Sequence, residues 1–588
     1  MEECQQTFAP KCRIACCDRM KLWSKVAVLL LLLAADANAG GWNGLPAEQG
    51  QTQHWLEAGR RDLLANLDKF PELALRKPAK NVILFIGDGM GVTAVTAGRI
   101  YSGQKYRDRK AHEQEPLSFE RFPVSGHVQT YAADKHTTDS ACSATAFLCG
   151  VKGRFETVGV GPEVGLKRCD DALQHPVHSI AKWAIDEGKW AGLVTNTRLT
   201  HATPAVLYAH APYRYWELPQ EVSEEGQRLG CRDIASQLVD GDVGPHLKVA
   251  FGGGRRYFMA NNQTDPQYPA LKGGRDDGRD LINDWLHLGG KRRYLWNSDD
   301  LENLDLNKHD NLLGLFDYKH FQYYLESVVK KTDHMRPTLE KMTEIAIKKL
   351  NQNDDGFFLL VEGGRIDPAL HENLGKVALE EIDQFDKAIE RALRLTDPSE
   401  TLIVVTADHG HAVSITGYPD RSVPIHGYFM EEEVEDGKPL TCLMFSGGPT
   451  GIFRDADDCV SRPNLNGTDY DAWNFTQIAF VNREYDGHDG SDVAIYAKGP
   501  GAHLFTGLID NTLIAHTMAY VGCIGPQKEL CQQRIQRTKS SPQKDRDRQT
   551  AVDYLPYLIA ILVLLVVILL LVLLAVVLNV YRLRSGRK

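Results

Sequence analysis

The sequence predicts an α/β fold with a mostly parallel central sheet and helices on both faces. Apolar runs of strand length, each closed by glycine or a polar cluster, carry this prediction, because that pattern is typical of parallel strands buried on both faces. Helical patterns lie between several runs, and such alternation indicates an open α/β sheet. The runs are 81–87, 190–196, 247–254, 357–364, 402–409 and 493–500.

The clearest helical pattern starts at Pro368 and continues through "LHENLGKVALEEIDQFDKAIERAL". Proline is favoured at the first helical position, so we expect one helix that Asp367 caps. Apolar residues recur along it at helical spacing, namely Leu374, Ala378, Ile382, Phe385 and Ile389.

The stretch from about 417 to 487 interrupts this alternation. It is rich in Gly, Pro, Asp and Asn and includes the acidic run "EEEVED". We expect an irregular insertion over the end of the sheet, within one large domain that extends from residue 40 to 535.

The N-terminus has the layout of a cleaved secretory signal. Basic residues precede an apolar run, which closes with small residues just before Gly40. Residues 1–39 therefore comprise a polar preface and a signal peptide. A start at Met20 gives the usual layout, whereas a start at Met1 adds an unusual cysteine-bearing preface.

The C-terminus predicts a membrane anchor. The uncharged run 557–578 is long enough to span a bilayer, and the basic tail 581–588 that follows is typical of a cytoplasmic end. We expect a polar stalk at 538–553 and a hydrophobic anchor at 555–580. A GPI-anchor signal cleaved near Ser540 is the alternative. Both place the body on the extracellular face of the cell membrane.

The cysteines and glycosylation sequons fit an oxidising extracellular compartment. We hypothesise three disulfides, although spacing alone does not fix connectivity. They are Cys169–Cys231, Cys442–Cys459 and Cys523–Cys531. Sequons at Asn262, Asn466 and Asn474 predict a glycoprotein. The net charge is −10, whereas a nucleic-acid-binding protein would carry an excess of basic residues.

Ligand-type side chains collect at the predicted strand ends. Asp88, Glu362 and Asp408 lie at the ends of three strands, His409 follows the third, and His488 comes just before another. Ligands of open α/β sheets bind at this edge. Each residue alone is a weak signal, since an aspartate after a strand is usually a turn residue. Together they predict a metal site.

The spacing of two pairs of residues suggests two separate metal ions. Asp367 and His371 are four residues apart and can face one metal ion, whereas Asp408 and His409 are neighbours that a bend can aim at a second. Imidazole and carboxylate ligands together suit Zn²⁺. The remaining strand-end carboxylates, with a hydroxyl, offer a harder all-oxygen site suited to Mg²⁺.

The stretch "DSACSATAFLCG" (139–150) predicts the start of a helix. Aspartate and serine are common helix caps, because their oxygens accept hydrogen bonds from free backbone N–H groups. Ser140 therefore either caps the helix or acts as a nucleophile, and this motif alone does not decide between them.

Six motifs together resemble the alkaline phosphatases, in particular the animal membrane-anchored branch. They are "NVILFIGDGMG", "TDSACSATAFLCG", "THATPAVLYAH", "VEGGRID", "TADHGH" and "DGHDGSDVAIYAKGP". The resemblance extends over about 79–531. It implies an alkaline phosphatase-like fold with a crown-like insertion, an alkaline optimum, small phosphate monoesters as substrates, a phosphoserine intermediate and a homodimer.

The resemblance also implies two zinc ions, one magnesium ion and a role for each matching residue. Ser140 matches the nucleophile, Arg214 the phosphate-binding arginine, and His201 a position close to magnesium. The ligands of one zinc match Asp408, His409 and Ser140, with Asp88 bridging to magnesium. Those of the other zinc match Asp367, His371 and His488. Thr203 and Glu362 match the remaining magnesium ligands.

Two departures from the family pattern stand out. Thr137 replaces an apolar residue beside the Asp-Ser pair. Some relatives bind a fourth ion, calcium, near the positions of Phe316 and Asp317, where Gln267 here replaces a carboxylate. The resemblance therefore supports a calcium site less well than the zinc and magnesium sites.

Three other functions share some of these features. Nucleotide pyrophosphatases and phosphodiesterases resemble this core but usually use threonine as the nucleophile, and sulfatases need a different local motif. A non-catalytic surface glycoprotein fits the anchor and the sequons equally well. The presence of Ser140 and the complete ligand set argue against all three.

Overall fold

The computed structural model describes residues 48–70, 73, 77–106, 114–432, 434, 436–451, 453–454, 460–540 and 543–585. The preface and signal peptide expected at 1–39 lie outside these residues. The chain divides into a large unit that includes Pro78–Cys531 and a C-terminal unit that includes Gln532–Lys588.

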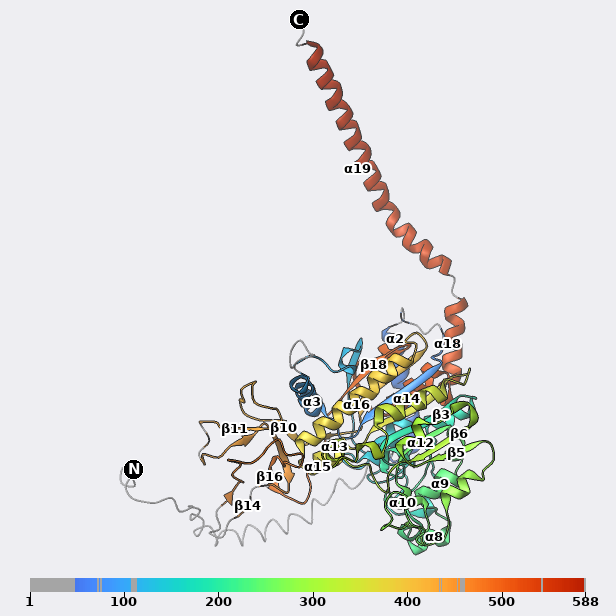
Figure 1. The fold of residues 1–588 in the computed structure, drawn as a ribbon. Coiled ribbons are helices and arrows are strands. Elements are labelled where there is room, and N and C mark those ends of the chain that lie inside the picture. The colour runs from blue at the N-terminus through green and yellow to red at the C-terminus, as the bar shows by residue number, and fades with distance from the viewer. Residues whose placement is uncertain are drawn as a thin grey trace, which may run out of the picture. The chain divides into compact units, whose positions relative to one another are not determined.

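One sheet organises the large unit (Figure 1). Ten of the described strands form it, in the order β19 (Gly507–Asp510), β2 (Val124–Gln129), β18 (Val493–Lys498), β8 (Thr401–Ala407), β1 (Asn81–Gly87), β7 (Phe357–Gly363), β3 (Trp190–Arg198), β4 (Val249–Gly253), β6 (Asn311–Leu315) and β5 (Arg292–Leu295). Strand β1 is central and pairs in parallel with both β7 and β8. The predicted α/β class and mostly parallel sheet are confirmed.

All six predicted strands are present, but the expected direction of 493–500 is wrong. Strand β18 runs antiparallel to both of its neighbours, β8 and β2. Its residues alternate between buried and half-buried, whereas β1, β7 and β8 are buried throughout. That alternation is the usual mark of an antiparallel strand. The prediction missed β2, β5, β6 and β19, three of which are short or partly exposed.

Helices cover both faces of the sheet. Phe85 of β1 contacts Phe385 of α16 (Gly375–Leu395), with ring centroids 5.9 Å apart. Val82 lies an odd number of residues away, so it points to the opposite face, where it meets Gly522 of α17 (Thr512–Gly522). On the first face α16 packs against α14 (Leu339–Leu350) and α3 (Val92–Lys105), and on the second α17 packs against α4 (Ser140–Cys149) and α2 (Thr52–Lys69).

The helix expected from Pro368 onward is two helices. Helix α15 spans Ile366–His371 and α16 begins at Gly375. Asn373 between them has φ of 56°, a left-handed conformation that ends an α-helix. Asp367 is not the cap, because it is the second residue of α15. Pro368 is the third residue, where the first turn still tolerates proline. The break leaves His371 at the end of a short helix.

The insertion at about 417–487 forms small sheets. Its strands β13 (Leu443–Gly448) and β16 (Ile478–Asn482) make one sheet with β10 (Val413–Ile415), which lies just before the insertion. Strand β11 (Tyr428–Phe429) pairs with β12 (Leu440–Thr441), and β14 (Phe453–Arg454) with β15 (Val460–Ser461). A local core of Met444, Leu465, Phe475 and Ile478 supports this region. The insertion belongs to the same compact unit as the large sheet.

Two of the three hypothesised disulfides are present, Cys169–Cys231 and Cys523–Cys531. Cys442 is buried, and its hypothesised partner Cys459 lies outside the described residues. Two further cysteines, Cys142 and Cys149, are buried on α4.

The C-terminal unit contains the long helix α19 (Gln543–Ser585), and the polar stretch expected as a stalk is largely helical. Its segment Pro556–Val580 has a mean hydropathy of 3.9 and is long and apolar enough to cross a membrane. This segment matches the predicted hydrophobic anchor at 555–580.

Candidate active site

Three adjacent strands place carboxylates at one edge of the sheet. Ile86 of β1 is level with Glu362 of β7 and Thr406 of β8. Asp88 follows β1, and Asp408 follows β8. Asp88, Glu362 and Asp408 have no exposed surface. Buried carboxylates of this kind require a compensating positive charge.

Helix α4 brings Ser140 to the same edge. Asp139 caps the helix, because its carboxylate accepts hydrogen bonds from the backbone N–H groups of Ala141 and Cys142. Ser140 is the first helical residue, and its Oγ lies 3.4 Å from Asp88 Oδ1 and 3.2 Å from His409 Nε2. The hydroxyl of Ser140 is therefore not occupied as the helix cap.

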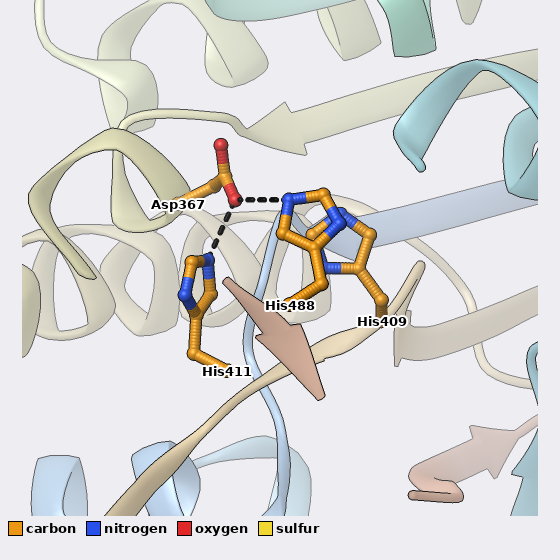
Figure 2. A group of neighbouring side chains, drawn as sticks. All are labelled: Asp367, His409, His411 and His488. Carbon is orange, nitrogen blue, oxygen red and sulfur yellow. Dashed lines mark hydrogen bonds and ion pairs between the residues drawn. The ribbon is translucent and has the colours of Figure 1, made fainter. Parts of the chain in front are cut away.

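A second group of side chains surrounds the carboxylate of Asp367 (Figure 2). Its Oδ1 lies 2.7 Å from His411 Nε2, 3.3 Å from His371 Nε2 and 3.5 Å from His488 Nε2. The rings of His488 and His409 stack with centroids 3.6 Å apart, which joins this group to Ser140. One oxygen surrounded by imidazoles is a suitable ligand set for Zn²⁺.

His411 is the member of this cluster that the sequence analysis missed. It lies in β9 (Gly410–His411), where it pairs with His488 of β17 (His488–Asp489). The motif "TADHGH" contains the signal, since residues two apart in an extended strand share a face. That rule would have grouped His411 with His409.

A third group offers only oxygens and one imidazole. Ligand atoms of Asp88, Glu362 and His201 all lie within 4.8 Å of one another. Among the described residues, buried atoms without a hydrogen-bond partner include Asp88 Oδ2, Glu362 Oε1, Thr203 Oγ1 and Asp408 Oδ2. Unpaired buried oxygens are rare in native proteins. These atoms fit a hard divalent cation.

The carboxylate pKa values reflect this crowding. Burial, followed by the charges of Asp408 and Asp367, raises the pKa of Asp88 well above its usual range. Burial also raises the pKa of Asp408 and brings that of Glu362 to about 7. Bound cations would favour the ionised form of each carboxylate and so reverse these shifts.

The pKa values of the histidines shift in different directions, so some rings favour the neutral form and others the protonated form. Burial lowers the pKa of His409 well below its usual range, so this ring is neutral, as a metal ligand must be. Burial also acts on His411, but the contacts with Asp367 and Asp486 outweigh it and raise the pKa to about 9. For Asp367, burial is offset by His371, His411 and His488, which hold the pKa well below its usual range.

Arg214 completes the site. Its Nη1 donates to Asp139 Oδ2 at 2.9 Å, and its Nη2 donates to His201 Nε2 at 3.2 Å. Burial opposes the charge of this guanidinium, but Asp139 outweighs it and raises the pKa of Arg214. The arginine therefore stays charged beside Ser140.

The predicted site residues all lie in one place. A pocket of about 360 Å³ is lined by residues that include Ser140, Arg214, Asp367, His371 and His488. Asp88 and His409 contact Ser140 from beneath this pocket. The other predicted site residues, Thr203, Glu362 and Asp408, are fully buried.

The region around Asp317 does not fit a calcium ion. Arg336 Nε lies 2.8 Å from Asp317 Oδ2, and both side chains are buried. The fully buried Arg255 donates to Asp265 and to Gln267 Oε1. Two guanidinium groups thus provide the positive charge beside these side chains, and no calcium-dependent role is assigned here.

The amino-acid sequence is similar to those of known proteins. A family model described as alkaline phosphatase matches residues 79–524. The chain belongs to the alkaline phosphatase family. The tissue-nonspecific alkaline phosphatase isozyme of Gallus gallus is 40% identical over 511 residues, which cover 86% of this chain and 95% of that protein. A membrane-bound alkaline phosphatase of Bombyx mori is 38% identical over 461 residues, or 77% of this chain and 82% of its own.

Solved alkaline phosphatase structures support the same fold. The enzyme of Thermus thermophilus aligns with a TM-score of 0.53 and 23% identity, covering 76% of this chain and 92% of its own. That of the Antarctic bacterium TAB5 aligns with a TM-score of 0.51 and 23% identity, covering 76% and 99%. The expected family and its enzymatic class are confirmed.

Proposed function

We propose that this chain is a metal-dependent phosphomonoesterase that hydrolyses phosphate monoesters through a phosphoserine intermediate at Ser140. The observation that carries the proposal is the position of Ser140. Its hydroxyl lies at the start of α4, in contact with Asp88 and His409, and shares one pocket with Arg214. A nucleophile, a cation for phosphate and three groups of metal-ligand side chains thus meet in one place.

Arg214 and the start of α4 would bind the phosphoryl group. A guanidinium presents parallel N–H groups that match two phosphate oxygens. The first turn of a helix adds free backbone N–H groups and the positive end of the helix dipole. Asp139 holds Arg214 at 2.9 Å, so the arginine is oriented before the substrate arrives.

The residues fit two zinc ions and one magnesium ion. Asp367, His371 and His488 would hold one zinc. Asp408, His409, Ser140 and Asp88 would hold the other, and Asp88, Thr203 and Glu362 would hold magnesium. The four unpaired oxygens described above support this assignment. When bound, divalent ions neutralise charge on the attacking and leaving oxygens. His201 would act indirectly, through its contact with Arg214.

The reaction would proceed as two displacements at phosphorus. Ser140 Oγ gives up its proton to solvent and attacks the phosphorus, the bond to the alcohol oxygen breaks, and the alcohol leaves with a proton taken from water. In-line geometry puts that oxygen opposite Ser140, toward Asp367, His371 and His488. Water then attacks the phosphoserine, the bond to Ser140 Oγ breaks, and inorganic phosphate leaves. Positioning and charge stabilisation supply most of the catalysis in such reactions.

We also propose that the enzyme body lies outside the cell, anchored by the C-terminal apolar helix. Three observations support this location, namely two disulfides, exposed sequons and the helix Pro556–Val580. The exposed sequon residues are Asn262, Asn466 and Asn474. Release of the enzyme by a phosphatidylinositol-specific phospholipase would indicate a GPI anchor, and retention a spanning helix.

A homodimer is the expected assembly, which sizing of the purified protein tests.

Metal removal and replacement test the proposed function. The chelated enzyme should lose phosphomonoesterase activity and recover it fully only when Zn²⁺ and Mg²⁺ are both returned. Full activity of the metal-free protein would overturn the metal assignment. A parallel assay with a phosphodiester distinguishes the phosphodiesterase alternative, since we expect turnover of the monoester to dominate.

A further inference from the structure

A second pocket lies beside the candidate active site. It has a volume of about 570 Å³, within the range of small-molecule sites. Tyr215 and His371 line both this pocket and the one that contains Ser140. The two pockets therefore share a wall, and that wall includes a residue on the side where the leaving alcohol would depart.

Two tyrosines line the second pocket beside a set of polar and charged side chains, which are His371, Glu372, Arg483, Glu484 and Asp486. Tyr215 is 44% exposed and Tyr485 is 52% exposed, and both line this pocket together with Pro368. They come from segments far apart in the chain, one next to Arg214 and the other at the end of the insertion. Exposed aromatic rings that converge on a pocket from separate segments are typical of ligand contacts.

The wall formed by Tyr485 is fixed in place. The backbone N–H of Asp486 donates to His371 O at 2.9 Å, and His371 Nδ1 lies 2.7 Å from Asp486 O. The carboxylate of Asp486 also accepts hydrogen bonds from Gly447 N and Ser446 Oγ. Tyr485 is therefore attached to a segment that is bonded to the active-site histidine itself.

The wall formed by Tyr215 is also held in place by neighbouring side chains. Trp216 is buried against the disulfide-bonded Cys169, and Tyr213 packs on the same cluster. The rings of Tyr213 and Tyr215 meet edge to face with centroids 5.1 Å apart, and the Arg214 guanidinium lies 5.5 Å from the Tyr215 ring. The ring next to the phosphate-binding cation thus has a defined position.

We infer that this pocket, the tyrosine subsite formed by Tyr215, Tyr485 and Pro368, receives the leaving group and selects phosphate esters of planar aromatic or heteroaromatic alcohols. The inference rests on the proposed function, because the phosphoryl group must lie between Ser140 and Arg214 for the alcohol to reach the subsite. Flat rings bury their faces against tyrosine and proline, whereas a small aliphatic alcohol leaves both rings exposed. Tyr215 and Tyr485 determine specificity and take no part in the bond changes.

The test compares kcat/KM for 1-naphthyl phosphate with kcat/KM for glycerol 2-phosphate. Loss of one aromatic contact should lower this ratio about three- to tenfold in Tyr215→Asn and in Tyr485→Ala, with a larger loss in the double variant. Tyr215→Phe should retain the ratio within about twofold, because the ring remains. Tyr418→Ala is the matched control, since Tyr418 belongs to the insertion, is 93% exposed and does not line the pocket.

An equal change for both substrates, or an unchanged ratio in the double variant, would overturn the subsite. A wild-type protein that hydrolyses neither ester would instead contradict the proposed function. Even then, binding of 1-naphthylmethylphosphonate and methylphosphonate tests the subsite without turnover. The naphthyl compound should bind more tightly, and Tyr215→Asn should remove most of that advantage. Equal affinities of the wild-type protein for the two phosphonates would also contradict the inference.

Discussion

Asp139 and Arg214 form an ion pair of 2.9 Å that ties the proposed phosphate-binding cation to the cap of α4, the helix that begins with Ser140. The same carboxylate accepts hydrogen bonds from Ala141 N, Cys142 N and Glu156 N. One side chain therefore fixes the start of α4 and the direction of Arg214. The distance between Ser140 and the phosphate-binding group depends on Asp139.

Removal of Arg214 should weaken phosphate binding. We expect Arg214→Ala to raise the inhibition constant for inorganic phosphate by about ten- to a hundredfold, because a charge-assisted pair of hydrogen bonds is lost. Arg214→Lys should recover only part of the loss, since a lysine offers a point charge in place of a planar fork. An unaltered inhibition constant in Arg214→Ala would show that phosphate binds elsewhere.

His411 should act through Asp367. Its Nε2 lies 2.7 Å from the proposed zinc ligand, so His411→Ala removes a contact that orients the carboxylate. Loss of such a contact typically lowers metal affinity about ten- to a hundredfold. Zinc retention during dialysis against a competing chelator measures the effect. The matched control is His426→Ala, which breaks a similar His–Asp pair with Asp471 in the insertion. Equal zinc retention in both variants would remove His411 from this role.

Calcium should not stabilise this enzyme. Arg336 already pairs with Asp317, so we expect the same Tm in calcium-free buffer and in millimolar calcium. Arg336→Ala should destabilise the fold by about 3–5 kcal/mol, because it leaves a buried carboxylate unpaired. Arg279→Ala, which breaks partly exposed pairs with Asp240 and Asp284, should cost less than about 1 kcal/mol. A rise in Tm on adding calcium would contradict this assignment.

Glu381 should make stability depend on pH. Burial raises the pKa of this carboxyl from 4.5 to about 7, so folding favours its protonated form. That contribution is fully present below the unfolded pKa and is lost as the pH rises through about 7. Glu381→Gln removes the titration. Relative to the wild type, the variant should gain about 1–3 kcal/mol between pH 4.5 and pH 8.

Denaturation of both proteins across this pH range measures the difference in their free energies of unfolding. A constant difference would mean that Glu381 does not titrate there. Glu340→Gln is a useful control, because Glu340 is half-exposed and pairs with Arg391 at the surface.

The sequence predicted the strands and most of the site because burial on both faces leaves a continuous apolar signal. Asp88, Glu362 and Asp408 could be placed together because parallel strands end at one edge. The turn at Asn373 was not predicted, since the apolar spacing continues across it and the left-handed conformation is held by tertiary contacts. Its side chain donates to Gly447 O, and its carbonyl accepts from Gln477 N, both from the insertion.

Other features depend on contacts between distant segments. The antiparallel direction of β18 is seen only in its pairing with β2 and β8, which are distant in sequence. The position of His411 depends on the pairing of β9 with β17. Tyr215 and Tyr485 lie 270 residues apart in sequence and meet at one pocket only after folding. Apolar spacing gives no information about such pairs.

The residue that becomes phosphorylated during turnover can be identified directly. The enzyme is mixed with a phosphate monoester, quenched in acid and digested, and the phosphorylated peptide is identified by mass spectrometry. We expect phosphate on Ser140 in the wild type and in Ser143→Ala, which removes a hydroxyl one turn further along α4. Ser140→Ala should carry no label and lose at least about a thousandfold in kcat/KM. Phosphate on another residue, or undiminished turnover by Ser140→Ala, would show that Ser140 is not the nucleophile.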